Sequence, residues 1–91
     1  MEKAMTVAAT VAVYPLRQLD YRAIDAAIAA LQQSGLAVDV QPMHTELSGP
    51  IEEVFTALRQ AFQSAASYGV TIMTVTLTNA CVPPSAPPDE R

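Results

Sequence analysis

Three segments of the chain alternate between two kinds of residue with a period of two, which is the pattern of a β-strand. They cover residues 5–14, 36–43 and 70–79. In the first segment one face is bulky and apolar, whereas the other is small and only weakly polar. The small face comprises Thr6, Ala8, Thr10, Ala12 and Tyr14. Because an ordinary solvated face carries more polar residues, we expect this face to meet another sheet or a ligand.

A first helix is predicted over residues 21–34. Asp20 precedes it as a plausible N-cap, and Gly35 follows it, where a left-handed conformation can close a helix. The apolar stripe expected to face inward consists of Tyr21, Ile24, Ala27, Ile28 and Leu31.

A second helix is predicted from Ile51 up to Gly69. The apolar residues that recur at helical spacing are Ile51, Val54, Phe55, Leu58, Phe62 and Ala65. Glu52 and Glu53 lie in the first turn, where a carboxylate interacts favourably with the positive end of the helix dipole. We expect that to be their only role.

The segment 42–50 connects these elements. Pro42 has no N–H to donate to a sheet and therefore suits the end of an edge strand. Residues 44–47 are short enough to form a hairpin partner for the strand at 36–43. Pro50, directly before Ile51, is expected at the first position of the second helix.

The resulting order is β-α-β-β-α-β, the split βαβ arrangement of the α+β ferredoxin-like fold. It places two helices on one face of a four-stranded antiparallel sheet, with the first and third strands in the centre. Residues 1–81 form this single domain. Residues 82–91 contain four prolines and no apolar periodicity, so a disordered tail is expected there.

Composition and charge limit the possible functions. Of the 91 residues, 51% are apolar and only 15% are charged, so apolar surface must be covered by something. We therefore expect a homo-oligomer, a dimer or tetramer. The net charge of −4 and the absence of a Lys/Arg run argue against nucleic-acid binding and are compatible with a small cationic ligand.

Targeting and disulfide signals are missing. Cys81 is the one cysteine and cannot form an internal disulfide, and no convincing secretory signal is present. No segment approaches the roughly 18 consecutive apolar residues that a membrane-spanning helix needs. A soluble cytoplasmic protein without membrane insertion is expected.

Catalytic patterns are weak. One histidine and one cysteine do not make a metal site, and neither a nucleophile-base constellation nor a glycine-rich phosphate loop is present. We expect no enzyme activity, catalytic residue, metal or cofactor. The best enzymatic alternative uses Arg17 to hold an anion, with Asn79 as a polar partner, as in acylphosphatase-like ferredoxin folds, although the glycine-rich signature of that loop is missing. A regulatory or interaction module without a ligand is a further alternative.

Four short segments carry a family resemblance. They are Val13-Tyr-Pro-Leu16, Pro42-Met-His-Thr45 followed by Gly49, Val54-Phe55 and Thr78-Asn-Ala-Cys81. In this order and spacing they resemble the YkoF-like thiamine/hydroxymethylpyrimidine-binding family over residues 6–81. The resemblance implies a ferredoxin-like domain, paired in tandem or assembled as an oligomer, that binds thiamine or its pyrimidine moiety without known chemistry. His44 departs from it, because a small residue often precedes this threonine in such proteins.

Thiamine combines a planar aminopyrimidine with a cationic thiazolium, so a site needs a flat surface, hydroxyl or carboxylate partners and little positive charge. Tyr14 is a candidate for stacking or hydrogen bonding and Thr45 for supplying a hydroxyl. Asp39 or Glu46 is a candidate for balancing the cation. The remaining candidate ligand-binding residues are Met43, His44 and Asn79.

Each candidate also has a purely structural interpretation. Tyr14 could cover the edge of the core, and Thr45 could serve hairpin geometry. His44 could be a solvated turn residue, and Asp39 and Glu46 could be exposed strand charges. The threonines of the last strand could form an interface rather than a pocket, and Cys81 could be a small apolar residue at a strand end.

The tail generates a first testable prediction. Deletion of residues 83–91 should change the melting temperature little, because no apolar core area is lost. A thermal melt of the truncated chain beside the full chain measures this. A large fall would show that the tail packs onto the domain.

Overall fold

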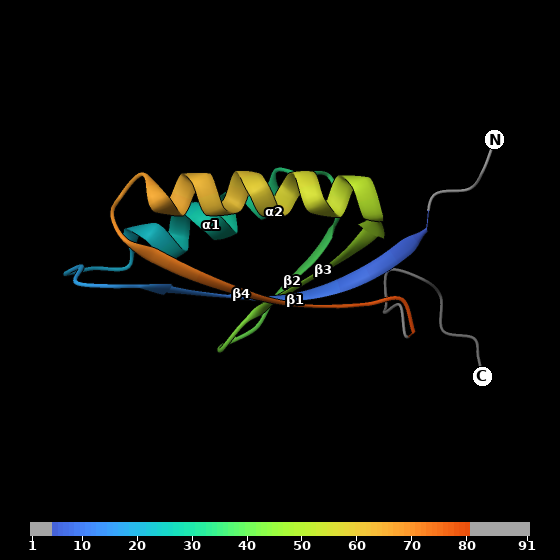
Figure 1. Cartoon of the computed structure of the whole chain (residues 1–91), viewed down its shortest axis with the longest axis horizontal. Coiled ribbons are helices and arrows are strands. Elements are labelled where there is room, and N and C mark those ends of the chain that lie inside the picture. Colours follow the sequence, from blue (N-terminus) through green and yellow to red (C-terminus); the bar gives the residue numbers. More distant parts are fainter. Residues whose placement is uncertain (1–4, 81–91) are drawn as a thin grey trace.

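The computed structural model describes residues 5–80, which form four strands and two helices. The order along the chain is β1 (Thr6–Pro15), α1 (Arg22–Gln32), β2 (Ala37–Val40), β3 (Thr45–Pro50), α2 (Ile51–Ala66) and β4 (Thr71–Thr78). The strands form one antiparallel sheet in the order β2-β3-β1-β4, and both helices cover the same face (Figure 1). The predicted ferredoxin-like α+β fold is confirmed. The predictions for Cys81 and for the tail fall outside the described residues.

The register of the sheet assigns each residue to a face. Thr45, Val11 and Val75 form one row across β3, β1 and β4 on the side of the helices. The next row, on the open face, contains Asp39, Glu46, Thr10 and Thr76. Since successive residues of a strand point to opposite faces, the small face of β1 predicted from the sequence is the open one.

The core lies between the helices and the central strands and is built largely from small residues. Its buried apolar side chains are Val7, Ala9, Val11, Ala23, Ala27, Leu31, Leu47, Val54, Ala57, Leu58, Ala61 and Ala65. The two helices pack against each other, and the alanines on their facing sides let them approach closely. Neither helix in residues 5–80 is long and apolar enough to cross a membrane.

The start of α1 differs from the prediction by one residue. The helix begins at Arg22, and its N-cap residue is Tyr21 rather than the predicted Asp20. A side-chain oxygen of Asp20 still accepts a hydrogen bond from the Arg22 backbone N–H at 3.2 Å. This bond lowers the pKa of the Asp20 carboxyl. Tyr21 was predicted to face inward and is instead 73% exposed, because it precedes the first helical turn. Ala23 takes the inward position.

Two of the apolar residues that recur at helical spacing in α2 are not buried. Phe55 and Phe62 are 53% and 39% exposed, whereas Ala57 and Ala61, which are not among those residues, are buried. The buried side of α2 is therefore formed by the alanines rather than by the phenylalanines. Pro50 also differs, since it is the N-cap residue rather than the first helical one.

A pair of leucines tests this description of the core. Leu47→Ala should destabilise the fold by about 2 to 5 kcal/mol, because Leu47 is 2% exposed in a central strand. The corresponding fall in melting temperature is roughly 10 °C or more. Leu19→Ala is the matched control, since Leu19 is fully exposed, and it should change stability by less than about 0.5 kcal/mol. Equal effects of the two substitutions in a denaturant titration would contradict the assigned core.

Candidate functional site

A cavity lies where β3 stops pairing with β1. The two strands pair from Thr6 opposite Pro50 to Val11 opposite Thr45, whereas β1 continues beside β4 to Pro15. Beyond Thr45 the β2–β3 hairpin projects away from β1 (Figure 1). The resulting cavity has a volume of about 120 Å³. Its lining is formed by Val11, Ala12, Val13, Ile24, Ala27, Ile28, Leu31, Gln41, Pro42, Met43, His44 and Thr45.

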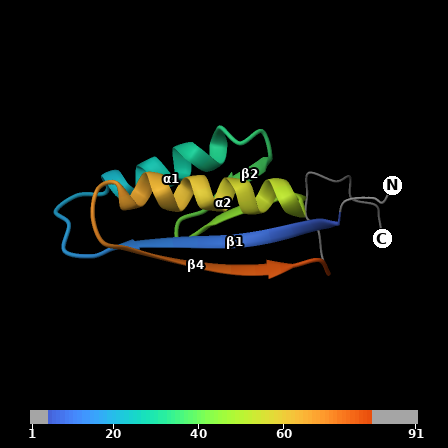
Figure 2. The same ribbon diagram turned by 45° about the horizontal axis from the view of Figure 1, so that its top comes forward.

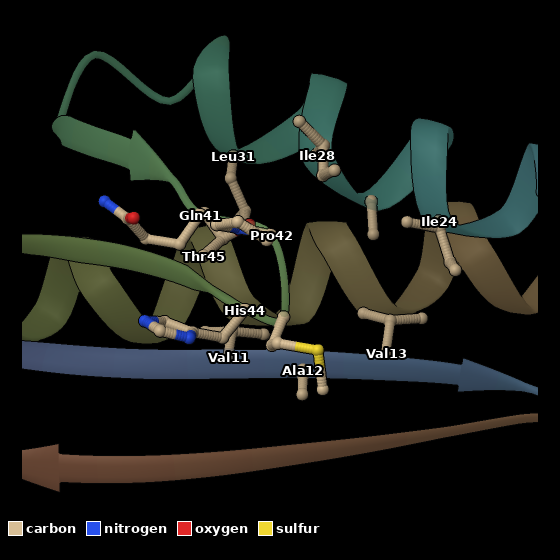
Figure 3. A pocket seen from close by; sticks show the side chains of 12 residues that line it. Val11, Ala12, Val13, Ile24, Ile28, Leu31, Gln41, Pro42, His44 and Thr45 are labelled. Atoms are coloured by element: carbon tan, nitrogen blue, oxygen red, sulfur yellow. The ribbon is translucent and has the colours of Figure 1, made fainter.

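Three elements enclose this cavity (Figure 3). Ile24 and Ile28 of α1 lie above it, and Val11 and Val13 of β1 lie below it. The hairpin forms the third wall. Its turn is tight, because the backbone N–H of Gln41 donates to the carbonyl of His44 at 2.8 Å across Pro42 and Met43. Most of the lining residues are apolar, and polar atoms contribute nearly as much of the lining surface as apolar atoms do.

Thr45 supplies a buried polar group to this cavity. It is 5% exposed and lies on the helix side of the sheet, opposite Val11. Among the described residues, no side-chain hydrogen bond involves its hydroxyl. A buried hydroxyl without a partner is costly, so a bound molecule that pairs with it would remove a penalty already present in the fold.

The backbone of β1 offers further hydrogen-bonding groups. In an antiparallel sheet, the N–H and C=O of one residue both point toward the strand on one side. Those of the next residue both point toward the strand on the other side. The Met5 carbonyl accepts from the N–H of Ile51, so the odd-numbered residues of β1 point toward β3. Val13 is odd-numbered and lies beyond the last pair, Val11 with Thr45. Its N–H and C=O are therefore directed toward the gap.

The outer rim of the hairpin carries two carboxylates held by cavity-lining side chains. His44 Nε2 lies 3.0 Å from a carboxylate oxygen of Glu46, and Gln41 Nε2 donates to Asp39 at 2.8 Å. An ionised carboxylate only accepts hydrogen bonds, so Nε2 of His44 carries the proton in this contact. In the neutral ring Nδ1 is then an acceptor. Asp39 and Glu46 also lie directly opposite each other across β2 and β3, where two like charges repel.

The structure gathers some of the predicted site residues and separates others. Met43, His44 and Thr45 line the cavity, and Asp39 and Glu46 lie on the open face beside it. Tyr14 follows Val13 on β1, half exposed on the open face opposite Ile72. Asn79 lies at the far end of the sheet, where its amide nitrogen is 4.0 Å from the sulfur of Met5.

The same arrangement removes the enzymatic alternative that combined Arg17 with Asn79. Arg17 follows the carboxyl end of β1, whereas Asn79 lies beside its amino end. Ten residues of extended strand separate these ends, a distance of roughly 30 Å. No single small anion could contact both side chains.

Sequence reasoning missed the wall contributed by α1 and the backbone of Val13. Ile24 and Ile28 were assigned to the core, and they are indeed half-buried there. Whether they also line a cavity depends on where β1 and β3 stop pairing, and the local sequence pattern does not reveal that position. In the part of the chain that the structure describes, no group of three or more His, Cys, Asp or Glu side chains could hold a metal ion.

Comparison with known proteins identifies the family. The sequence model of one protein family, described as thiamine-binding protein, matches residues 9–78. The chain belongs to this family. The match includes both helices, all of the hairpin and most of β1 and β4. Membership in the thiamine-binding protein family points to a thiamine-related role and to a binding protein rather than an enzyme. A search of curated proteins found no match.

Several solved structures share the fold of this chain. A Streptococcus pneumoniae protein is 28% identical with a TM-score of 0.76, and the alignment covers 81% of this chain and 86% of that one. A domain of unknown function from Bacillus cereus is 25% identical with a TM-score of 0.74, covering 82% and 76%. A candidate thiamine biosynthesis and salvage protein from Thermotoga maritima is 21% identical with a TM-score of 0.70, covering 79% and 81%. At that identity the last likeness concerns the fold alone.

Proposed function

We propose that the chain binds thiamine or its hydroxymethylpyrimidine moiety noncovalently, with the pyrimidine ring in the cavity between α1 and the β2–β3 hairpin. The observation that carries the proposal is a cavity of matching size that contains the buried, unpartnered hydroxyl of Thr45. A cavity of about 150 Å³ in another protein holds one benzene ring. The 120 Å³ found here therefore suits one ring and not two.

The polar groups around the cavity complement an aminopyrimidine. Such a ring has acceptor nitrogens and a donor amino group in one plane. The Thr45 hydroxyl and the Val13 N–H can donate to ring nitrogens. Nδ1 of His44 and the Val13 carbonyl can accept from the amino group. Ile24 and Ile28 would cover the faces of the ring, and burying their apolar surface adds to the affinity.

The charge on the hairpin rim suits the second half of thiamine. With the pyrimidine in the cavity, we place the thiazolium outside it, beside Asp39 and Glu46 on the open face of the hairpin. A cation there would offset the repulsion between these facing carboxylates. Free hydroxymethylpyrimidine has no thiazolium and would not gain this contribution.

The biological role we infer is ligand handling in thiamine precursor uptake or salvage by a cytoplasmic homo-oligomer. The apolar surface left on a single chain supports an oligomer, since Tyr14, Phe55, Phe62, Ile72 and Val75 are all at least 39% exposed. A protein that assembles but binds neither ligand would instead be a regulatory or interaction module.

Replacement of Thr45 tests the proposed hydrogen bond. Thr45→Val keeps the side-chain shape and removes the hydroxyl, so it should weaken binding by roughly 1 to 2 kcal/mol, or about five- to thirtyfold. Stability should remain nearly unchanged. The matched control is Thr76→Val on exposed β4, which should leave affinity at the wild-type value. Isothermal titration calorimetry with thiamine and with hydroxymethylpyrimidine measures the affinity of each variant for each ligand.

Three outcomes would contradict this proposal. One is the absence of detectable heat or thermal shift with either ligand at millimolar concentration. Another is wild-type affinity in Thr45→Val, and the third is loss of the fold in that variant, which would make Thr45 structural.

Neutralisation of the rim tests the place of the cation. Thiamine should bind more tightly than hydroxymethylpyrimidine in the wild type. The double variant Asp39→Asn, Glu46→Gln should lose this preference, by about 1.5- to 5-fold per exposed charge contact. Hydroxymethylpyrimidine affinity should stay constant, which provides the internal control. Equal affinities of the two ligands in the wild type would show that the site reads only the pyrimidine.

A further inference from the structure

His44 is the one titratable side chain among the residues that line the cavity. It is also part of the acidic rim, because its Nε2 lies 3.0 Å from a carboxylate oxygen of Glu46. The side chains of His44 and Glu46 are 32% and 42% exposed, so solvent reaches both groups. One side chain therefore borders the cavity and also contacts a carboxylate that we place beside the thiazolium.

The negative charges near this imidazole come from the hairpin. Asp39 lies directly opposite Glu46 across β2 and β3, and Gln41 donates a hydrogen bond to Asp39 at 2.8 Å. Within residues 5–80 no arginine forms an ion pair with either carboxylate. The rim thus has two facing carboxylates, and His44 is the only basic side chain in contact with one of them.

The other two walls of the cavity have no titratable group. α1 lies on the β2 side of the molecule, whereas α2 lies on the β4 side (Figure 2). The residues that α1 and β1 contribute to the lining are all aliphatic. Among the residues that line the cavity or form the rim, His44 is therefore the one that can carry a positive charge.

The imidazole of His44 has two charge states with opposite consequences for the rim. The neutral ring donates one hydrogen bond to Glu46 and leaves both carboxylate charges uncompensated. A second proton, on Nδ1, makes the ring a cation and turns the same contact into an ion pair. Histidine ordinarily changes its charge between pH 5 and 8. The net charge that the rim presents to a ligand can therefore change within that range.

We propose that His44, through its charge state and its contact with Glu46, determines whether the site prefers a cationic ligand to a neutral one. The inference rests on the proposed function, in which thiamine and hydroxymethylpyrimidine use the same cavity. While His44 is neutral, the rim attracts the thiazolium. Once His44 is protonated, the imidazolium is itself the cation beside Glu46 and repels a second one. The preference for thiamine then falls.

The proton and the cationic ligand are linked in both directions. If the proton on His44 weakens thiamine binding, bound thiamine must weaken the binding of that proton by the same factor. Hydroxymethylpyrimidine has no thiazolium and makes no such contribution. A hydrogen bond from the pyrimidine to Nδ1 would be lost for both ligands on protonation, so it cancels in the ratio of their affinities.

The ratio of the thiamine affinity to the hydroxymethylpyrimidine affinity measures the preference. Isothermal titration calorimetry at about pH 8 and about pH 5.5 brackets the range in which histidine changes its charge. His44→Gln provides the baseline, because glutamine keeps a donor for Glu46 without a titratable group. Its change of ratio with pH reports protonation of the ligands and of the carboxylates. In the wild type the ratio should fall about 1.5- to 5-fold more than this baseline, the effect of one exposed charge contact.

His44→Lys fixes the opposite charge state. Its positive charge is present at both pH values, so its ratio at pH 8 should already be about 1.5- to 5-fold below that of the wild type. Circular dichroism checks that each variant is folded.

An independent measurement uses the fact that the chain contains one histidine. In untagged protein the imidazole protons of His44 give a single set of NMR signals, which report its titration directly. Saturation with thiamine should move the midpoint of this titration to lower pH than saturation with hydroxymethylpyrimidine does.

Three results would overturn the inference and leave pyrimidine binding in the cavity intact. These are equal affinities of the wild type for both ligands at pH 8, the same change of ratio with pH in the wild type and in His44→Gln, or a wild-type ratio in His44→Lys at pH 8. If a variant does not fold, the NMR titration decides, and equal midpoints with the two ligands would overturn the inference. Binding of neither ligand by the wild type at pH 8 would instead contradict the proposed function itself.

Discussion

The unequal pairing of β1 with its two neighbours is the constraint on which the rest of the structure depends. β1 has ten residues and pairs with β3 only from Thr6 to Val11, but with β4 from Ala8 to Pro15. On the β3 side the last part of β1 lacks a partner strand, so α1 and the hairpin enclose a cavity there. On the other side β4 is a long, regular strand with a free outer edge. The unequal pairing of this one strand thus creates the candidate site.

Small side chains between the helices determine which strands of the sheet the helices cover. Ala23, Ala27, Ala57, Ala61 and Ala65 are all at most 1% exposed. Because they let α1 and α2 lie close together, the helix pair covers the central strands better than β4. Val75 and Leu77 therefore remain partly exposed although they are on the helix side. Phe55 and Phe62, on the flank of α2 away from Ala57, remain 53% and 39% exposed.

The hairpin separates apolar recognition from charge. Thr45 points to the helix side, its neighbour Glu46 points to the open side, and His44 is hydrogen-bonded to Glu46 while it lines the cavity. In the proposed binding mode the uncharged ring contacts the cavity and the cationic ring contacts the acidic rim. The departure at His44 from the family resemblance thus adds a side chain that links the cavity to the acidic rim.

The sequence by itself determined the order of elements, the two faces of each strand and the tight turn at Pro42, because these depend on interactions between residues near one another along the chain. Gly35 has a φ of 85°, the left-handed conformation predicted for it, although α1 already ends at Gln32. Only the tertiary structure decided where β1 and β3 part and which flank of α2 meets α1. Helical periodicity shows that Phe55 and Phe62 are on an apolar flank, but not whether anything covers it. The strand pattern likewise placed Tyr14 and Asn79 at strand ends, and antiparallel pairing with β1 put those ends at opposite sides of the molecule. The register of the strands and the covering of each surface depend on contacts between segments far apart in the sequence. The local pattern of residues carries no information about these contacts.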